Sequence, residues 1–440
     1  MRLSSLHTDW KVIGLVGLIH MSSHFFQLVL PTLYLSLAHD YGYDFTQLGL
    51  LASTFFLVSC LGQASSGFIV DRIGGGPVMR FGMLGFVISA CLIGISDSYG
   101  TLLLAAFIGG LGNSIFHPAD YAVLNDRVSH HRLGHAFSVH GFTGNMGWAL
   151  TPVYMAFLIY LFNWRVAAFG AGALVAVILA LAWLGRDLLA PAAVAASAQA
   201  DNADESEELA PKATVSAQEE AQTATGSIDL SNSGAWQTLT ILVSQPALWG
   251  AFLFFACTTI AMSSVQNYTI PMLGQVYGID KVLAGMALSS YMLLAAAGML
   301  AGGFVAGANP KSERIVAISL VLAGAFLVVL ATGWFPQFVA MGFVALAGFC
   351  SGVSAPSRDM LIRRVTPKGA TGTVYGLVYS GMDVGSSLGP FLFGFMLDMG
   401  LSLAPWIGAG IAFVAAAGFA LWVAHAANAG TAARPQTVAG

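Results

Sequence analysis

Long apolar segments alternate with short polar ones along nearly the whole chain. Each apolar segment has about the 20 residues that a helix needs to cross a bilayer, whereas a membrane barrel would show short segments of alternating polarity. The pattern therefore predicts an all-α membrane protein with twelve transmembrane helices. The expected spans are 11–37, 45–70, 77–96, 100–126, 133–160, 163–185, 246–272, 281–306, 312–332, 335–362, 371–398 and 402–425.

The positive charges predict how these helices are oriented, because Lys and Arg are retained on the cytoplasmic side of short loops. With the N-terminus inside, all of the 17 Lys and Arg except Arg165 and Lys281 fall on or near the cytoplasmic face. Missing one helix would invert every later loop, so this agreement supports the even number of spans. Both termini are expected in the cytoplasm.

Composition agrees with a membrane location, since 57% of the residues are hydrophobic and 9% are charged, against about 25% charged in soluble domains. The first apolar segment continues past Pro31 without a small-residue cleavage site, so we expect a first span rather than a removable secretion signal. The cysteines stand singly in apolar segments without CxxC spacing and are interpreted as packing residues. They are Cys60, Cys91, Cys257 and Cys350.

One polar segment divides the chain. Residues 187–235 carry nine acidic residues and one basic residue among Ala, Ser, Thr and Gln, a composition typical of a disordered linker. We therefore predict an N-terminal six-helix bundle over 1–186, a cytoplasmic linker over 187–245, a C-terminal six-helix bundle over 246–427 and a cytoplasmic tail over 428–440.

The two halves resemble each other in sequence. A shift of 238 residues lays Pro356 on Pro118 and Pro390 on Pro152, and a shift of 236 lays Gly285 on Gly49. These matches fall at the same places in the two halves, so we expect two pseudo-symmetric six-helix repeats. Such repeats predict a binding site between the halves near the middle of the bilayer, exposed to each side in turn.

The segment GFIVDRIGGGP, residues 67–77, is similar to the motif between the second and third helices of the major facilitator superfamily. Gly75 and Gly76 stand where members of that family usually carry two basic residues. The resemblance implies the major facilitator fold and a gating role for the residues in matching positions. These are Gly67, Asp71, Arg72 and Gly74.

Three further segments resemble the fosmidomycin-resistance type of drug efflux protein within that superfamily. They are FHP at residues 116–118, SVHGFTGNMGWALTP at 138–152 and SGMDVGSSLGP at 380–390. The glycine-rich fifth helix ending in Pro152 and its repeat ending in Pro390 also resemble the superfamily's antiporter motif. This resemblance implies efflux.

An ionisable group at bilayer depth is costly and is a functional candidate. Asp383 is expected about 18 Å into the eleventh helix, near the middle of the bilayer, and Asn145 is its counterpart in the repeat. An apolar setting favours the protonated carboxyl, so we predict that Asp383 carries the coupling proton and that Asn145 is its neutral counterpart in the cavity. Alternatively, Asp383 accepts hydrogen bonds from Ser386, Ser387 or a neighbouring helix.

The first helix carries His20 and His24 one turn apart on one face. Imidazole changes charge near neutral pH, so His24 is a candidate for proton coupling and His20 for the cavity, unless they only donate hydrogen bonds between helices. In the family that the chain resembles, helices 1, 4, 7 and 10 line the cavity. Uncharged contacts to substrate or at the outer gate are expected from Gln27, Gln266 and Asn267.

The fourth helix places Asn113 at the cavity, and His117 and Asp120 in its inner third. Pro118 removes a helix hydrogen bond and predicts a kink. We expect His117, Asp120 and His140 to form a polar cluster under the cavity, with His117 and Asp120 as candidates for proton coupling and His140 for the cavity, or alternatively a structural hinge. Arg358 is the counterpart of Asp120 in the repeat, and an ion pair between the two would lock the inner gate.

The segment SHHRLGH, residues 129–135, could hold a di-metal centre, but a solvated loop is the favoured interpretation because its counterpart TPKGATG has no histidine. We therefore predict no metal and no cofactor. The expected partners are a small-molecule substrate, protons and the lipid bilayer. No nucleic acid is expected, because no basic stretch is interleaved with aromatics. We expect a monomer.

The leading functional hypothesis is a secondary transporter in a bacterial inner membrane that exports a drug or metabolite in exchange for protons. There is no GxxxxGK[ST] phosphate loop for ATP hydrolysis, and no enzyme activity is expected. Proton-coupled uptake of an organic anion is the nearest alternative. A membrane metalloenzyme using the loop histidines, or a sensor or scaffold, would belong to other classes of protein.

Overall fold

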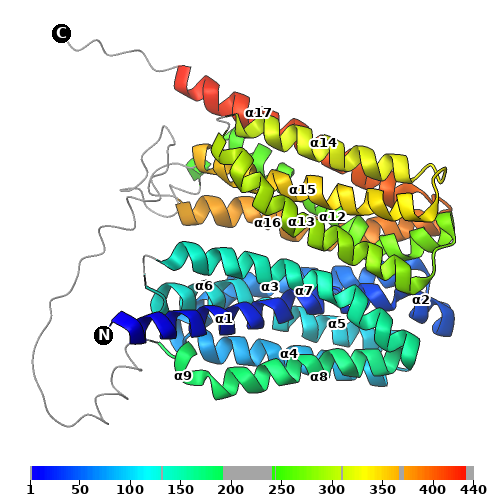
Figure 1. Cartoon of the computed structure of the whole chain (residues 1–440), viewed down its shortest axis with the longest axis horizontal. Helices are drawn as coiled ribbons and strands as arrows, with labels where there is room; N and C mark the ends of the chain where they lie inside the picture. The colour runs from blue at the N-terminus through cyan, green and yellow to red at the C-terminus, as the bar shows by residue number, and fades with distance from the viewer. Residues whose placement is uncertain are drawn as a thin grey trace, which may run out of the picture.

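The computed structural model describes residues 2–129, 132–191, 240–242, 244–308, 311–365 and 371–432. Most of the predicted linker and the last residues of the predicted tail lie outside this part of the chain. Within it, long helices form two bundles that lie side by side (Figure 1). Helix α1 begins and helix α17 ends at the same end of the molecule, which we call the terminus face; the other end is the opposite face.

The N-terminal bundle contains the first half of the chain. Its helices are α1 (Arg2–Gln27), α2 (Val29–Tyr41), α3 (Phe45–Ile73), α4 (Gly75–Ile95), α5 (Tyr99–Asn113), α6 (Phe116–Arg127), α7 (Leu133–Leu161), α8 (Trp164–Leu184) and the short α9 (Arg186–Leu189). Two predicted spans are each divided into two helices. α1 and α2 share the first span, and α5 and α6 share the fourth.

The break in the fourth span has a local cause. Pro118 has no N–H to bond to the carbonyl of Ser114, and the chain turns at Ser114 and Ile115 before α6 begins. The predicted kink is thus present one turn before the proline. Because of this break, α6, which carries His117 and Asp120, runs in a different direction from α5.

The C-terminal bundle repeats this order with fewer interruptions. Its helices are α12 (Pro246–Tyr277), α13 (Lys281–Ala308), α14 (Ser312–Leu330), α15 (Gln337–Val365), α16 (Thr371–Asp398) and α17 (Ala404–Ala432). The twelve spans agree with the prediction from hydropathy.

The turn after the first span is built alike in both halves, which supports the repeat. Gly42 closes α2 with φ +70°, and Gly278 closes α12 with φ +65°, a left-handed conformation that favours glycine. Asp44 then accepts a hydrogen bond from the N–H of Gln47 at the start of α3, and Asp280 accepts from the N–H groups of Val282 and Leu283 in α13.

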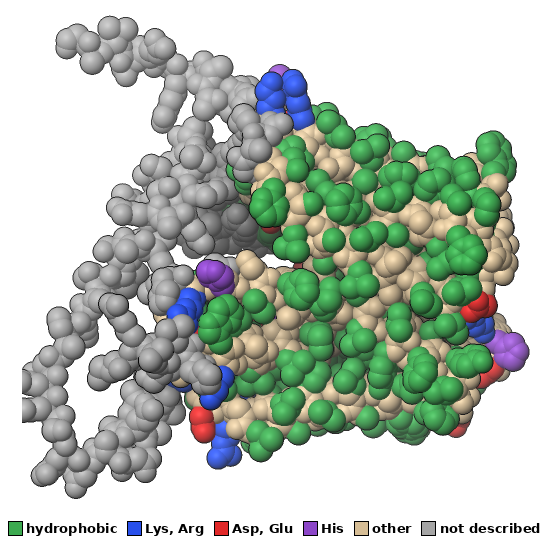
Figure 2. Space-filling model, in the orientation of Figure 1, with side chains coloured by type: hydrophobic (Ala, Val, Ile, Leu, Met, Phe, Trp, Pro, Cys, Tyr) green, Lys and Arg blue, Asp and Glu red, His purple; other side chains and the backbone are tan. Residues whose placement is uncertain are grey.

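The outer surface suits a bilayer. Large apolar side chains such as Phe81, Leu184 and Phe304 are 76 to 83% exposed. Figure 2 shows hydrophobic side chains covering the middle of the molecule, with Lys and Arg gathered mainly at the terminus face. Ten helices of the described chain are long and apolar enough to cross a membrane, counting α1 with α2 and α5 with α6 as single spans. The other two spans are α7 and α16.

These two less apolar helices lie between the bundles rather than facing lipid alone. α16 packs against α3, and α7 packs against α13, so two helix pairs join the bundles along a surface that we call the seam. Each of these helices therefore has one side at the seam and another side against a helix of its own bundle, α1 for α7 and α12 for α16. Asn145 belongs to α7 and Asp383 to α16.

Candidate transport site

Helix α1 presents a polar row to the interior of the N-terminal bundle. Its members, at spacings of three and four residues, are His20, Ser23, His24 and Gln27. α7 can approach this row closely because it has Gly144 there. A Cβ atom at Gly144 would lie 3.0 Å from Nε2 of His20 and 2.9 Å from the His24 ring, tighter than ordinary contact.

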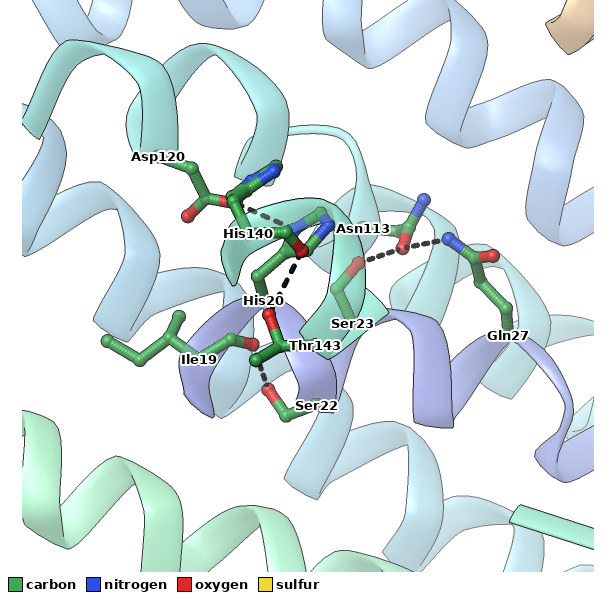
Figure 3. A network of polar contacts seen from close by, with 9 residues as sticks. All are labelled: Ile19, His20, Ser22, Ser23, Gln27, Asn113, Asp120, His140 and Thr143. Carbon is green, nitrogen blue, oxygen red and sulfur yellow. Dashed lines mark hydrogen bonds and ion pairs between the residues drawn. The ribbon is translucent and has the colours of Figure 1, made fainter. Parts of the chain in front are cut away.

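Asp120 joins three helices of this bundle. Its side chain is fully buried, and its Oδ2 lies 2.8 Å from Nδ1 of His20 in α1 and 3.1 Å from Nε2 of His140 in α7 (Figure 3). Its Oδ1 has no hydrogen-bond partner among the described residues. One carboxylate from α6 thus holds two histidines, and the predicted cluster of Asp120 with His140 is present.

His24 and His117 complete a group of rings around His20. The centroid of the His20 ring lies 3.6 Å from that of His140, 4.5 Å from that of His24 and 5.4 Å from that of His117. His20 and His140 are buried, whereas His117 is exposed. We call His20, His24, His117, His140 and Asp120 the histidine cluster; the proton-coupling roles of its members stay predictions.

A second network lies next to the cluster, farther from the terminus face along α1. Oδ1 of Asn113 accepts from Ser23 at 2.9 Å and from Gln27 at 3.2 Å, and its Nδ2 donates to Ser59 of α3 at 2.8 Å. Trp148 of α7 donates from Nε1 to Gln27 at 2.9 Å. The predicted cavity residues Asn113 and Gln27 are therefore linked to each other, and α1, α3, α5 and α7 meet there.

Asp383 lies on the seam. Its carboxyl group is close enough to the thiol of Cys60 in α3, which belongs to the other bundle, to interact with it electrostatically. The hydroxyl of Ser387 donates to the backbone carbonyl of Asp383, not to its carboxyl group. Asn145, the counterpart of Asp383, donates to the carbonyl of Gly141 in its own helix at 3.0 Å.

The bundles are joined by hydrogen bonds towards the opposite face. Tyr34 of α2 donates to Oδ1 of Asn267 in α12 at 2.9 Å, and Ser53 of α3 accepts from the N–H of Phe391 in α16 at 3.2 Å. The carboxylate of Asp398, at the end of α16, accepts from the N–H groups of Phe45 and Thr46 at the start of α3. The predicted outer-gate residue Asn267 therefore lies between the bundles, and Gln266 beside it is buried.

At the terminus face, by contrast, the two bundles are separated. Figure 2 shows a notch between them there. Arg72 is exposed, and Gly74 joins α3 to α4 with φ +81°. The side chain of Asp71, and Gly67 as a packing position, lie outside the described side chains. The gating roles of these four residues stay predictions.

The predicted ion pair between Asp120 and Arg358 is wrong for this conformation. Asp120 faces the histidines of its own bundle, and Arg358 pairs with Asp359 at 2.9 Å and lies over the ring of Phe255. The physical reason is that positions equivalent in a repeat lie in corresponding places of separate bundles. Equivalence alone does not bring them into contact.

Several residues of the site were not predicted from the sequence. Cys60 was interpreted as a packing residue, and Ser23, Ser59 and Trp148 were not singled out. Asp398 at a helix end was also missed. The polar spacing along α1 includes Ser23, so that signal was present; the partners on α3 and α7 depend on how the helices pack.

Comparison with known proteins agrees with this geometry. The profile of the Major Facilitator Superfamily matches residues 15–339 and 261–439, which together cover most of the chain. The chain belongs to the major facilitator superfamily. It is therefore a multi-pass membrane protein of a transporter family rather than of an enzyme family, and transporters of this superfamily bind small-molecule substrates.

Relatives within the superfamily have varied substrates. The fosmidomycin resistance protein of Escherichia coli is 31% identical over 180 residues, 41% of this chain and 44% of that protein, so the match spans less than half of this relative. The probable L-galactonate transporter of the same organism is 22% identical over 377 residues, 83% of this chain and 78% of that protein.

A solved structure shares the fold of this superfamily member. The bacterial homologue of the human lysosomal transporter Spinster, in an inward-facing and unoccupied conformation, matches with a TM-score of 0.70 at 15% identity and covers 97% of both chains. At this identity the likeness shows the fold alone.

Proposed function

We propose that the chain is a secondary transporter of a bacterial inner membrane that exports a small organic solute in exchange for protons, and that Asp383 carries the proton. The observation that carries this proposal is the position of Asp383 on the seam, against Cys60 of the other bundle. Alternating access moves one bundle against the other, so the surroundings of a carboxyl group at the seam change during each cycle.

The orientation follows from the charges. Lys and Arg gather mainly at the terminus face, which is the cytoplasmic side by the positive-inside rule. Both termini are then cytoplasmic, and the hydrogen bonds at the opposite face close the periplasmic side. The conformation is then inward-facing, ready to receive a solute from the cytoplasm.

Export is favoured over uptake by two likenesses. The glycine-rich helices ending in Pro152 and Pro390 resemble the antiporter motif of the superfamily, and one relative is a fosmidomycin resistance protein. Fosmidomycin and other small anionic antibacterials are therefore the first probes. Uptake of an organic anion by symport is the competing outcome of the same experiment.

In this proposal, Asp383 gains and loses its proton without a strong acid or base as a direct partner. Among the described residues, Cys60 is the titratable group that lies against its carboxyl group. The fixed positive charge of Arg358 is engaged by Asp359. A change of Asp383 alone should therefore remove the coupling without disturbing an ion pair.

The test compares intact protein with Asp383→Asn and with Asp359→Asn as a matched control in the same bundle. In everted membrane vesicles with an acidic interior, intact protein should accumulate labelled fosmidomycin, and Asp383→Asn should lose at least tenfold of this proton-driven uptake. Substrate counterflow without a pH gradient should persist in Asp383→Asn, because exchange does not require proton transfer.

Each outcome decides one part of the proposal. Unchanged proton-driven flux in Asp383→Asn rejects Asp383 as the carrier. Accumulation only when the gradient is reversed favours uptake by symport. Flux that is insensitive to pH gradients of both signs rejects proton coupling.

A further inference from the structure

We propose that His20, His117 and His140 bind a divalent transition-metal ion such as Zn²⁺, Ni²⁺ or Co²⁺. Each ring offers one nitrogen, and the three nitrogens lie within 4.8 Å of one another. Imidazole is a preferred ligand of these ions, with metal to nitrogen distances of about 2.0–2.1 Å for zinc. Side-chain shifts of about 1 Å would bring the three nitrogens around one ion.

Asp120 orients the proposed ligands. In metal sites, a ligating histidine usually donates its other N–H to a carboxylate, which fixes the tautomer and the direction of the ring. His20 makes this contact, with Nδ1 at 2.8 Å from Oδ2 of Asp120. When Nδ1 is the donor, Nε2 of His20 carries the lone pair that a metal needs.

The buried carboxylate of the cluster, which has an oxygen without a hydrogen-bond partner among the described residues, also favours the binding of a cation. Asp120 is fully buried in a membrane-spanning bundle, and within the described chain its partners are histidines, not Lys or Arg. Its Oδ1 is buried without a hydrogen-bond partner among the described residues. A divalent ion beside Asp120 would compensate a charge that is costly at this depth.

The fold does not require these histidines. The counterparts of His20, His117 and His140 in the C-terminal repeat are Ala256, Ala355 and Val378. Equivalent helices therefore pack in the other bundle with small or apolar residues in these places. The cluster is an addition to the common architecture, which is expected of a binding site rather than of a packing element.

An ion can reach the site from the space between the bundles. His117 is exposed, as is Tyr121 one turn farther along α6. Tyr121 is close enough to Asp359 of the C-terminal bundle to interact with it electrostatically. The exposed side of α6 thus faces the other bundle, and His117 stands between solvent there and the buried His20 and His140.

This proposal departs from the expectation that the chain binds no metal, and it is independent of the proposed proton coupling. The loop histidines of residues 129–135 play no part in it: His135 is exposed at the start of α7, and His130 and His131 lie outside the described residues. They serve as the control for the experiment.

The test is metal binding by the purified full chain, prepared with a tag that contains no histidine and freed of metal by dialysis. Titration with Zn²⁺ should give one bound ion per chain with a micromolar or lower dissociation constant. Co²⁺ should give the visible absorption of a nitrogen-ligated ion. His117→Ala and His140→Val, which copy the C-terminal repeat, should each weaken binding at least tenfold, and Asp120→Asn by about 10- to 100-fold.

The control carries His130→Ala, His131→Ala and His135→Ala together and should bind the ion as the intact chain does. Absence of stoichiometric binding by the intact, monodisperse chain would overturn the proposal. Binding that survives His117→Ala, or that is lost in the loop control, would overturn it as well. His117 is exposed, so its variant keeps the test valid if a change at buried His140 prevents folding.

Discussion

Gly49 of the N-terminal bundle lies directly against the carbonyl group of Pro390 in the C-terminal bundle. The repeat makes the same contact a second time, since Gly285 lies against the carbonyl of Pro152, where a Cβ atom would be 3.2 Å from the oxygen. Both contacts cross the seam. The tighter one, at Gly49, also includes the hydroxyl of Tyr268.

Gly49→Ala should therefore weaken the closed opposite face. The added methyl group meets backbone, which cannot move away as a flexible side chain can, and overpacking of this kind costs about 1–3 kcal/mol. Cysteines introduced near the opposite face should react faster with a membrane-impermeant maleimide in Gly49→Ala. Gly285→Ala is the matched control, with little change expected; equal labelling of both variants would contradict the difference between the two contacts.

Asp398→Ala should also weaken the closed opposite face, in this case through the loss of a helix cap. Its carboxylate caps the start of α3 from the other bundle, and loss of a helix cap costs about 1 kcal/mol, or about fivefold in an equilibrium. The same labelling assay should report this increase. Asp44→Ala removes a cap that α3 receives from its own bundle and should lower stability without the change in labelling.

Asn113→Ala should destabilise the N-terminal bundle. Three hydrogen bonds to Ser23, Gln27 and Ser59 are lost, and at about 0.6 kcal/mol for each bond within a membrane the loss is about 2 kcal/mol. Thermal unfolding in detergent should shift to lower temperature. Asn125→Ala, which loses only a bond to the carbonyl of Tyr121 in its own helix, should unfold as the intact chain does.

Asp120→Leu should cost more than a comparable change at the surface. It leaves Nδ1 of His20 and Nε2 of His140 without their buried acceptor, at about 1–3 kcal/mol for each unpaired group. Asp359→Leu removes a carboxylate that is 48% exposed and should have a small effect. Similar unfolding temperatures for the two variants would argue against Asp120 as the hub of the cluster.

The sequence predicts the helices of this fold well because the bilayer sets their length, and hydropathy reports that length directly. It also brings His117, Asp120 and His140 together, since neighbouring spans joined by a short loop pack side by side. Contacts across the seam are different. Asp398 with Phe45, and Cys60 with Asp383, depend on helix tilt and on which faces meet, and neither is encoded by a local pattern.

The repeat identified equivalent positions in the two bundles, but it did not predict which residues are in contact. It correctly related Gly285 to Gly49, since each lies against the carbonyl of a proline in the other bundle. It suggested a pair between Asp120 and Arg358, whose partners lie within their own bundles.

His117 gives the N-terminal bundle an exposed imidazole on the side that faces the C-terminal bundle, where the corresponding position is Ala355. A solute with one polar end would settle between the bundles with that end towards α6. In the proposed alternating access, each bundle keeps its own side chains as it moves. A solute held in this way would keep its orientation, and the end that enters first would also leave first.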